Sequence, residues 1–167
     1  MNKYSSQSLF SGLLSIVLFL ISHLYISAQI NLTATGGSLN ASYTTLTDAF
    51  VAINAGTHTG TITINVVANT TEPATGAVLN ASGTGSANYT SILIQPSGGA
   101  ARVISGAINA GVPMIDLNGA DNVTFNGLNS GGNSLTLDNT TVSATSGTST
   151  VRLQADATSN LFTNINI

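Results

Sequence analysis

Apolar and polar residues alternate over short runs along most of this 167-residue chain. Thr61–Val67 (TITINVV) places three apolar side chains on one face, and Ser91–Gln95 (SILIQ) repeats the pattern. A period of two is typical of a half-buried β-strand. Further short runs lie at Ile30–Thr33, Val78–Leu79, Arg102–Ser105, Met114–Leu117, Val123–Phe125, Ser134–Asp138, Val151–Leu153 and Leu161–Ile167. The pattern therefore predicts an all-β fold made of many short strands.

One segment, Thr45–Asn54, has a helical period instead. Its apolar residues recur at i, i+3, i+4 and i+7, namely Leu46, Ala49, Phe50 and Ile53. Thr45 is suited to be the N-cap, Asp48 completes a capping-box pattern, and Asn54 and Gly56 end the helix. A helix of about ten residues is not stable alone. Because no second helix follows, we expect it to cap the open end of a β-stack rather than to lie on an ordinary surface.

Short one-faced strands fit either a β-sandwich or a solenoid. Two features favour the solenoid. No two-residue hairpin turn is flanked by runs long enough to pair as a ribbon, and the chain repeats itself weakly. Ile115–Leu117 resembles Val151–Leu153, 36 residues later, and Phe125–Asn129 resembles Phe162–Asn166, 37 residues later. An alternative shift of 38 residues aligns Asn122-Val123 with Asn160-Leu161.

Stacking the repeats in this register has specific consequences. Phe125 would lie over Phe162 in the interior. Asp116 would face outward below Arg152 and form a surface ion pair worth about 0–1 kcal/mol. Thr140–Ser149 would protrude as a loop. Corner positions are predicted at five asparagines whose amides can bond the backbone or the next coil: Asn118, Asn122, Asn126, Asn129 and Asn133.

The N-terminus has the pattern of a signal peptide. Lys3 precedes the apolar run Leu9–Leu24, and Ile26-Ser27-Ala28 offers a small-residue cleavage site, which makes Gln29 the mature N-terminus. An uncleaved anchor is the alternative reading, but the small-residue exit favours cleavage. We therefore predict a signal peptide over residues 1–28, a lead-in over 29–42 and a β-helix domain over 43–167. The protein would be secreted, extracellular or on the outer cell surface, without a membrane contact after cleavage.

Charge is scarce in this chain, at 5% of residues, and cysteine is absent. After loss of Lys3, two arginines and six acidic residues remain, a net charge of −4. This composition excludes a basic surface for nucleic acid or anionic lipid. Without disulfides, stability must come from packing and hydrogen bonds.

Few residues are candidates for chemistry. Asp116 and Asp121 lie close together in sequence, but an ion pair and a turn explain them better than an active site. A lyase base would have to be Arg102 or Arg152. His58 has no metal-ligating neighbour in sequence and is expected in an exposed loop. The glycine pairs Gly98-Gly99 and Gly131-Gly132 are not followed by helices, so they are not phosphate loops. We predict no catalytic residue, cofactor site or metal site in this chain.

Two motifs carry a family resemblance. The helix YTTLTDAFVAIN (Tyr43–Asn54) and the stretch IDLNGADNVTFNGLNSGGNSLTLDN (Ile115–Asn139) resemble right-handed parallel β-helix proteins of the pectate-lyase-like superfamily. More narrowly, they resemble large secreted repeat proteins of Bacteroidetes. The likeness covers Ser42–Ile167. It implies a right-handed parallel β-helix, a chain that is the N-terminal piece of a longer protein, and, in related enzymes, carboxylate clusters for Ca²⁺ with an Arg or Lys base.

Two functions from different classes fit these observations. The first is a structural or adhesive β-helix segment that contacts polysaccharides or cell-surface glycans without catalysis, as the uncharged Thr/Asn/Ser exterior suggests. The second is the cap and first coils of a polysaccharide lyase or glycoside hydrolase whose active site lies on further coils. The last coil, with Leu161, Phe162, Ile165 and Ile167, is expected to promote self-association.

Overall fold

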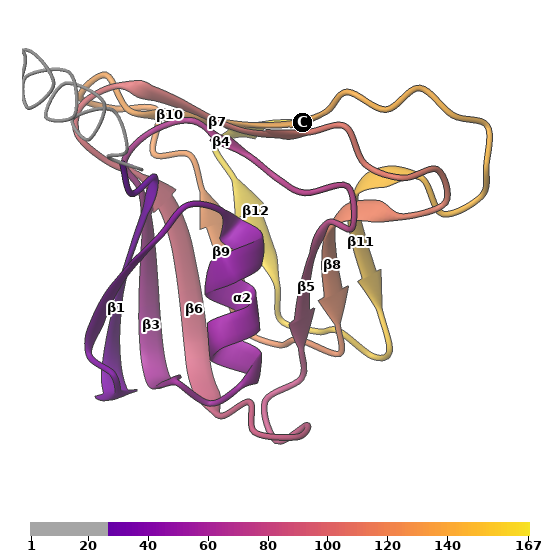
Figure 1. Ribbon diagram of the computed structural model, residues 1–167. Helices are drawn as coiled ribbons and strands as arrows, with labels where there is room; N and C mark the ends of the chain where they lie inside the picture. Colours follow the sequence, from indigo (N-terminus) through magenta and orange to yellow (C-terminus); the bar gives the residue numbers. More distant parts are fainter. Residues whose placement is uncertain (1–26) are drawn as a thin grey trace, which may run out of the picture.

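The chain folds as a parallel β-solenoid of about three turns with one short helix, and this confirms the predicted fold class (Figure 1). The computed structural model describes residues 27–167. The predicted signal peptide, apart from Ser27 and Ala28, lies outside the described residues. Within residues 27–167, no helix has the length and apolar character needed to cross a bilayer.

Each turn of the solenoid contains three strands. The first turn contains β3 (His58–Val66), β4 (Thr70–Thr71) and β5 (Ala77–Asn80). The second contains β6 (Tyr89–Pro96), β7 (Ala101–Gly106) and β8 (Pro113–Asn118). The third contains β9 (Val123–Asn126), β10 (Ser134–Asn139) and β11 (Ser149–Gln154). A fourth turn begins with β12 (Leu161–Thr163) and β13 (Ile165–Asn166).

Equivalent strands of successive turns form three sheets. Sheet A has the order β12-β9-β6-β3-β1-β2, sheet B is β13-β10-β7-β4, and sheet C is β11-β8-β5. All pairs between turns are parallel. Because strands of the same turn belong to different sheets, the chain encloses a three-sided core (Figure 1).

The predicted register is confirmed at its two principal pairs. Arg152 pairs with Asp116 across β11 and β8, and Phe162 pairs with Phe125 across β12 and β9. The alternative shift of 38 residues is therefore wrong for β12. The sequence repeat also aligned Leu128 with Ile165, but these residues do not pair, because Ile165 pairs with Leu135 of β10. The third turn needs a long corner between β9 and β10, whereas only Asn164 separates β12 from β13.

An antiparallel ribbon at the N-terminal edge was not expected. β1 (Ile30–Gly37) pairs with β2 (Asn40–Tyr43) and also, antiparallel, with β3. The absence of a two-residue hairpin turn in the sequence therefore did not rule out a ribbon with a longer connection. Its connection is longer than a two-residue turn, since Thr33 pairs with Asn40 and the backbone N–H of Ala34 donates to the carbonyl of Leu39. The segment predicted as a lead-in thus supplies two strands of sheet A.

The interior consists of stacked ranks of apolar side chains. Ile64, Ile94 and Phe125 occupy equivalent positions in three neighbouring strands of sheet A, and all are fully buried. Phe162 continues this rank, and its ring lies parallel to that of Phe125 with centroids 5.0 Å apart and planes inclined by 7°. The predicted aromatic stack is confirmed. Each rank repeats at the spacing of about 4.8 Å that backbone pairing imposes on neighbouring strands.

Helix α2 (Leu46–Asn54) covers the N-terminal end of this core, as predicted. Its four predicted apolar residues are fully buried, and the Thr45 side chain caps the helix by accepting from the backbone N–H of Asp48 (3.0 Å). At the other end, Asn54 acts as a short substitute strand beside β5. Its side chain donates to the carbonyl of Val78 (2.9 Å) and accepts from the N–H of Asn80 (3.0 Å). The open edge of β5 is therefore partly closed by the helix.

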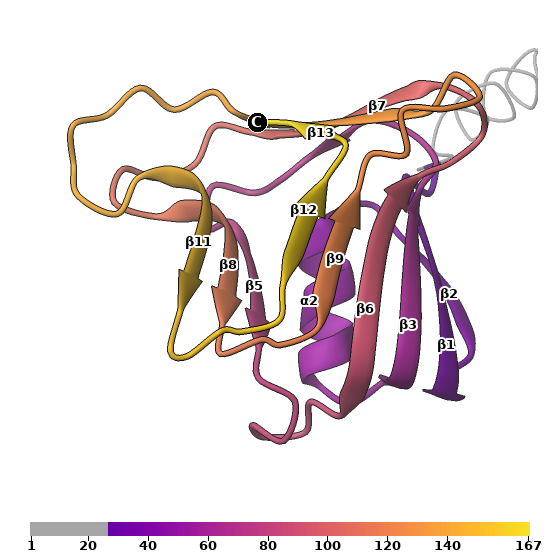
Figure 2. The same ribbon diagram turned by 180° about the vertical axis from the view of Figure 1, so that it is seen from behind.

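Two loops project from the solenoid where sheet B is followed by sheet C: the segment between β7 and β8 and the longer segment between β10 and β11. The segment between β10 and β11 extends far from the core, as predicted for Thr140–Ser149 (Figures 1 and 2). It lies along the loop of the preceding turn, where the Thr141 hydroxyl donates to the carbonyl of Ile108 (2.6 Å) and the N–H of Gly111 donates to the Thr148 hydroxyl (2.7 Å). The loop is thus stacked on its neighbour rather than isolated.

Candidate functional site

Asp116 lies on the middle strand of sheet C, with Val78 on one side and Arg152 on the other. Its carboxylate accepts from Arg152 Nε (3.1 Å), Arg152 Nη2 (2.6 Å) and Gln154 Nε2 (2.9 Å). The predicted ion pair is confirmed, but the prediction of a surface pair is wrong, because only 4% of Asp116 is exposed. The Asp116 carboxylate faces away from the core, and side chains on the flanking strands β5 and β11 enclose it. Hydrogen bonding to Asp116 raises the pKa of Arg152.

Replacing Arg152 with methionine is expected to lower the free energy of unfolding by about 2 kcal/mol, because the Asp116 carboxylate stays buried without its cation. The effect is smaller than for a fully buried pair, because the Arg152 side chain is 36% exposed. The double variant Arg152→Met/Asp116→Asn should recover most of this loss. Urea unfolding of residues 29–167 measures both, with Asp156→Asn on the exposed surface as a control expected within about 0.5 kcal/mol. Equal losses in the single and double variants would contradict the coupling.

Asp121 and Arg102 also have structural roles. Asp121 accepts from the backbone N–H (2.6 Å) and hydroxyl (2.8 Å) of Thr158 in the next turn, and these bonds lower the pKa of Asp121. Arg102 Nε and Nη2 donate to the carbonyl of Ser97 at 3.1 and 3.0 Å and so hold the corner before β7. Asp116 and Asp121 therefore accept hydrogen bonds from different residues of the next turn.

His58 is buried, so the prediction of an exposed loop histidine is wrong. It begins β3, and its ring holds both ends of the β1–β2 ribbon: Nδ1 lies 2.5 Å from the carbonyl of Ser38 and Nε2 lies 2.6 Å from the Tyr43 hydroxyl. Because a carbonyl only accepts, Nδ1 carries a proton, and in the neutral ring Nε2 accepts from Tyr43. Sequence reasoning missed this role because Ser38 and Tyr43 reach the ring only when the ribbon folds back on β3.

Glu72 is the buried carboxylate that sequence reasoning missed. It follows β4 and is 3% exposed, directly below the first turn of α2. It accepts from the backbone N–H groups of Leu46 (3.0 Å) and Thr47 (2.8 Å), and from the hydroxyls of Thr47 (2.7 Å) and Thr70. A carboxylate is favourable at a helix N-terminus, where N–H groups lack internal partners. The one sequence signal was an acidic residue inside a run of small uncharged residues.

The charged groups described above bind neighbouring segments of the chain. In the described part of the chain, no three His, Cys, Asp or Glu residues are grouped so that they could hold a metal ion. Every buried polar side-chain atom there has a hydrogen-bond partner. The charged residues with buried or partly buried contacts are therefore occupied in holding the turns together.

The outer face of sheet A differs from these internal networks. Its outward side chains are uncharged and mostly carry hydroxyl or amide groups: Asn31, Thr33, Asn40, Ser42, Thr61, Thr63, Asn65, Ser91, Gln95 and Thr124. We call these ten residues the polar face. One row across the strands runs Ser42–Asn31–Asn65–Gln95, and a second runs Asn40–Thr33–Thr63–Leu93–Thr124. Leu93 interrupts the second row.

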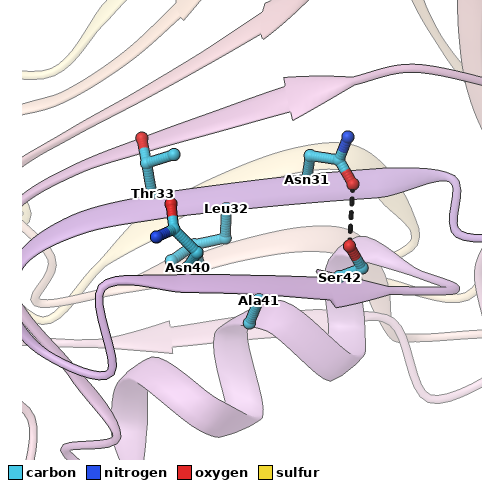
Figure 3. A pocket seen from close by; sticks show the side chains of 6 residues that line it. All are labelled: Asn31, Leu32, Thr33, Asn40, Ala41 and Ser42. Atoms are coloured by element: carbon cyan, nitrogen blue, oxygen red, sulfur yellow. Dashed lines mark hydrogen bonds between the residues drawn. The ribbon is translucent and has the colours of Figure 1, made fainter.

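A shallow groove of about 410 Å³ lies at the β1–β2 end of the polar face. It is lined by Asn31, Leu32, Thr33, Asn40, Ala41 and Ser42 (Figure 3). The Ser42 hydroxyl donates to Asn31 Oδ1 (2.9 Å), and this bond orients the amide so that its Nδ2 points away from Ser42 (Figure 3). Farther along the same row, Gln95 Nε2 donates to Asn65 Oδ1 (3.1 Å). The groove therefore joins a row of amides that are already oriented by their neighbours.

Tyr89 marks the start of β6 and makes the fold sensitive to alkaline pH. Its hydroxyl donates to the carbonyl of Asn80 (2.6 Å). Burial, with a smaller effect from the charge of Asp121, raises the pKa of Tyr89 to about 12. An unfolded tyrosine titrates near 10. Because the pKa of Tyr89 is higher in the folded state, the buried neutral Tyr89 contributes fully to stability below about pH 10. This contribution is lost as the pH rises through about 12.

We therefore expect urea stability to fall by about 2–3 kcal/mol between pH 9.5 and 12. Residues 29–167 contain two tyrosines, Tyr43 and Tyr89, so the absorbance change at the tyrosinate band that is lost in Tyr89→Phe belongs to Tyr89. The pKa of Tyr43 is also raised, chiefly by burial. Tyr89→Phe should flatten the pH profile while Tyr43 still titrates. A Tyr89→Phe chain with an unchanged alkaline profile would contradict the assignment.

Neither the protein-family models, nor the curated proteins, nor the solved structures compared with this chain match it. Function therefore rests on the geometry of the chain itself.

Proposed function

We propose that this chain is a segment of a secreted or cell-surface solenoid that acts as a rigid, non-catalytic scaffold and contacts glycans. One observation carries the proposal: the charged side chains near the core bind neighbouring turns, while the broad outer face of sheet A presents uncharged hydroxyl and amide groups. Asp116, Asp121 and Glu72 each accept two or more bonds from other segments. A general acid or base needs a carboxyl group that can reach a substrate.

The test uses the mature chain, residues 29–167, with polysaccharides of different charge. Polygalacturonate with Ca²⁺ and neutral β-glucan would each be incubated with the chain. We expect no unsaturated product by ultraviolet absorbance and no new reducing ends, and we expect the chain to co-sediment with at least one insoluble polysaccharide. Cleavage of either polymer would overturn the scaffold role. A chain that co-sediments with none of the polysaccharides tested would overturn the contact role.

A second expectation concerns the C-terminal end of the solenoid. The outer edges of β11, β12 and β13 have no strand partner among residues 27–167. Leu153, which pairs with the buried Leu117, is 49% exposed there, and Ile167 is 70% exposed. Unpaired edges beside apolar surface favour association. We therefore expect polypeptide 29–167, expressed alone, to self-associate, with a mass above the monomer in light scattering.

Leu153→Lys is expected to shift this chain toward the monomer, because a charge at the exposed end opposes apolar contact. Val51→Lys, on the exposed face of α2 at the opposite end, is the matched control, since Val51 is 62% exposed. If the unmodified chain is monomeric at all concentrations, the expectation is wrong. If Val51→Lys has the same effect as Leu153→Lys, association does not occur through the C-terminal end.

A further inference from the structure

We propose that the groove on the β1–β2 ribbon, together with the first row of the polar face, is a binding site for neutral polysaccharide chains. The inference rests on the proposed scaffold function and adds the place of contact and the class of glycan. The lining side chains Asn31, Thr33, Asn40 and Ser42 combine amide and hydroxyl groups (Figure 3). Such groups both donate and accept hydrogen bonds, as the hydroxyls of a sugar do.

The charge of the site selects a neutral ligand. None of the ten residues of the polar face is charged, and the two arginines lie elsewhere, at a corner of sheet B and on sheet C. A uronate or sulfate polymer would find no cation here to pair with, and the chain as a whole is acidic. Neutral hydroxyls lose little by leaving water if each finds a partner, which this surface offers.

The orientation of the amides strengthens the argument. The Ser42–Asn31 and Asn65–Gln95 hydrogen bonds use one oxygen of each asparagine. The Nδ2 groups of Asn31 and Asn65 have no hydrogen-bond partner in the described part of the chain, so each can donate to a ligand. Both lie in one row across adjacent paired strands, β1 and β3. Donors held in place lose little conformational freedom on binding.

The geometry of the groove also indicates which kind of contact holds the polysaccharide. No residue that lines the groove is aromatic, so there is no ring on which a sugar can stack. Contact is therefore by hydrogen bonds at several points along a polymer, and it depends on multivalency rather than on one deep subsite. A long polymer is consequently a better probe than a short oligosaccharide.

The experiment is native affinity electrophoresis of residues 29–167 in gels that contain hydroxyethylcellulose, galactomannan or polygalacturonate. We expect retardation in at least one neutral gel and none in polygalacturonate. Asn31→Asp keeps the acceptor for Ser42 but removes the free amide donor, and Thr33→Val removes the neighbouring hydroxyl. The double variant should weaken retardation by about tenfold or more. Circular dichroism and urea unfolding establish that each variant is folded.

Asn109→Asp is the matched control, because it makes the same chemical change on an exposed loop away from sheet A. It should be retarded like the unmodified chain. Retardation confined to polygalacturonate, or no retardation in any gel, would overturn the neutral-glycan site. If the double variant is retarded as strongly as the unmodified chain, glycan contact occurs through another face, so the site is wrong while the proposed function stands.

Discussion

Replacing Glu72 with alanine is expected to lower the free energy of unfolding by about 3–5 kcal/mol. The carboxylate is buried and accepts from two backbone N–H groups of α2 and two threonine hydroxyls. Alanine would leave these donors without partners in a place that water reaches poorly, and it would remove a negative charge from the positive end of the helix. Because α2 closes the N-terminal end of the core, losing the hydrogen bonds at its first turn also weakens the packing of the helix on the core.

Urea unfolding of residues 29–167, followed by circular dichroism, measures this effect. Glu72→Gln is the graded variant. It keeps the shape and one acceptor oxygen but brings an NH₂ group toward other donors, so a loss of about 1–3 kcal/mol is expected. Asp138→Ala removes an exposed carboxylate from β10 and should change stability by less than about 0.5 kcal/mol. A loss below about 1 kcal/mol for Glu72→Ala would show that the helix end is satisfied in another way.

Replacing Phe125 with alanine should cost about 3–5 kcal/mol. Phe125 is fully buried between Ile94 of the preceding turn and Phe162 of the next. Its removal loses the burial of one aromatic ring, leaves a cavity within a continuous rank and ends the stacking with Phe162. Since neighbouring turns meet mainly through these ranks, a gap at Phe125 weakens two interfaces at once.

Phe162→Ala is the matched control for Phe125→Ala. The chemical change is the same, but Phe162 is only partly buried and has a stacked partner on one side. Its loss should therefore be about 1–2 kcal/mol. The measurement is the midpoint and slope of urea unfolding for both variants at equal protein concentration. Equal losses for the two substitutions would contradict a core that is closed at Phe125 and open beyond Phe162.

The asparagine-rich composition has a structural cause that limits what it says about function. Side-chain amides bridge successive turns where the chain bends. Asn118 Nδ2 donates to Asn80 Oδ1 (3.1 Å), and Asn164 Nδ2 donates to Asn126 Oδ1 (3.2 Å). Asn122 adopts a left-handed backbone conformation with φ of 58°, which asparagine tolerates better than most residues. These observations confirm the predicted corner role, and they leave the polar face of sheet A as the set of amides and hydroxyls that is not explained by corners.

Close approach between turns also explains a small residue at one corner. A Cβ atom at Gly127 would lie 1.9 Å from the carbonyl oxygen of Asn164 in the next turn. The N–H of Gly127 donates to the carbonyl of Thr163 (3.0 Å). The corner after β9 can therefore be stacked only if residue 127 has no side chain.

The sequence by itself determined the solenoid class, the capping helix, most strands and the register of Asp116 with Arg152 and Phe125 with Phe162. These depend on short-range patterns: a period of two in the strands, a period of 3.6 in α2, and repeated motifs whose side chains stack in the same order. The helix could be placed because its cap residue, Thr45, and its apolar face lie within one short segment.

Only the tertiary structure decided which polar side chains are buried. Asp116 is enclosed by strands of two other turns, His58 by a ribbon that folds back on β3, and Glu72 by a helix that starts 26 residues before it. The burial of a polar group depends on neighbours that are distant in sequence, and local alternation carries no signal for them. The groove at β1–β2 likewise exists only because an antiparallel ribbon joins a parallel sheet, which places Asn31 beside Ser42 and in line with Asn65.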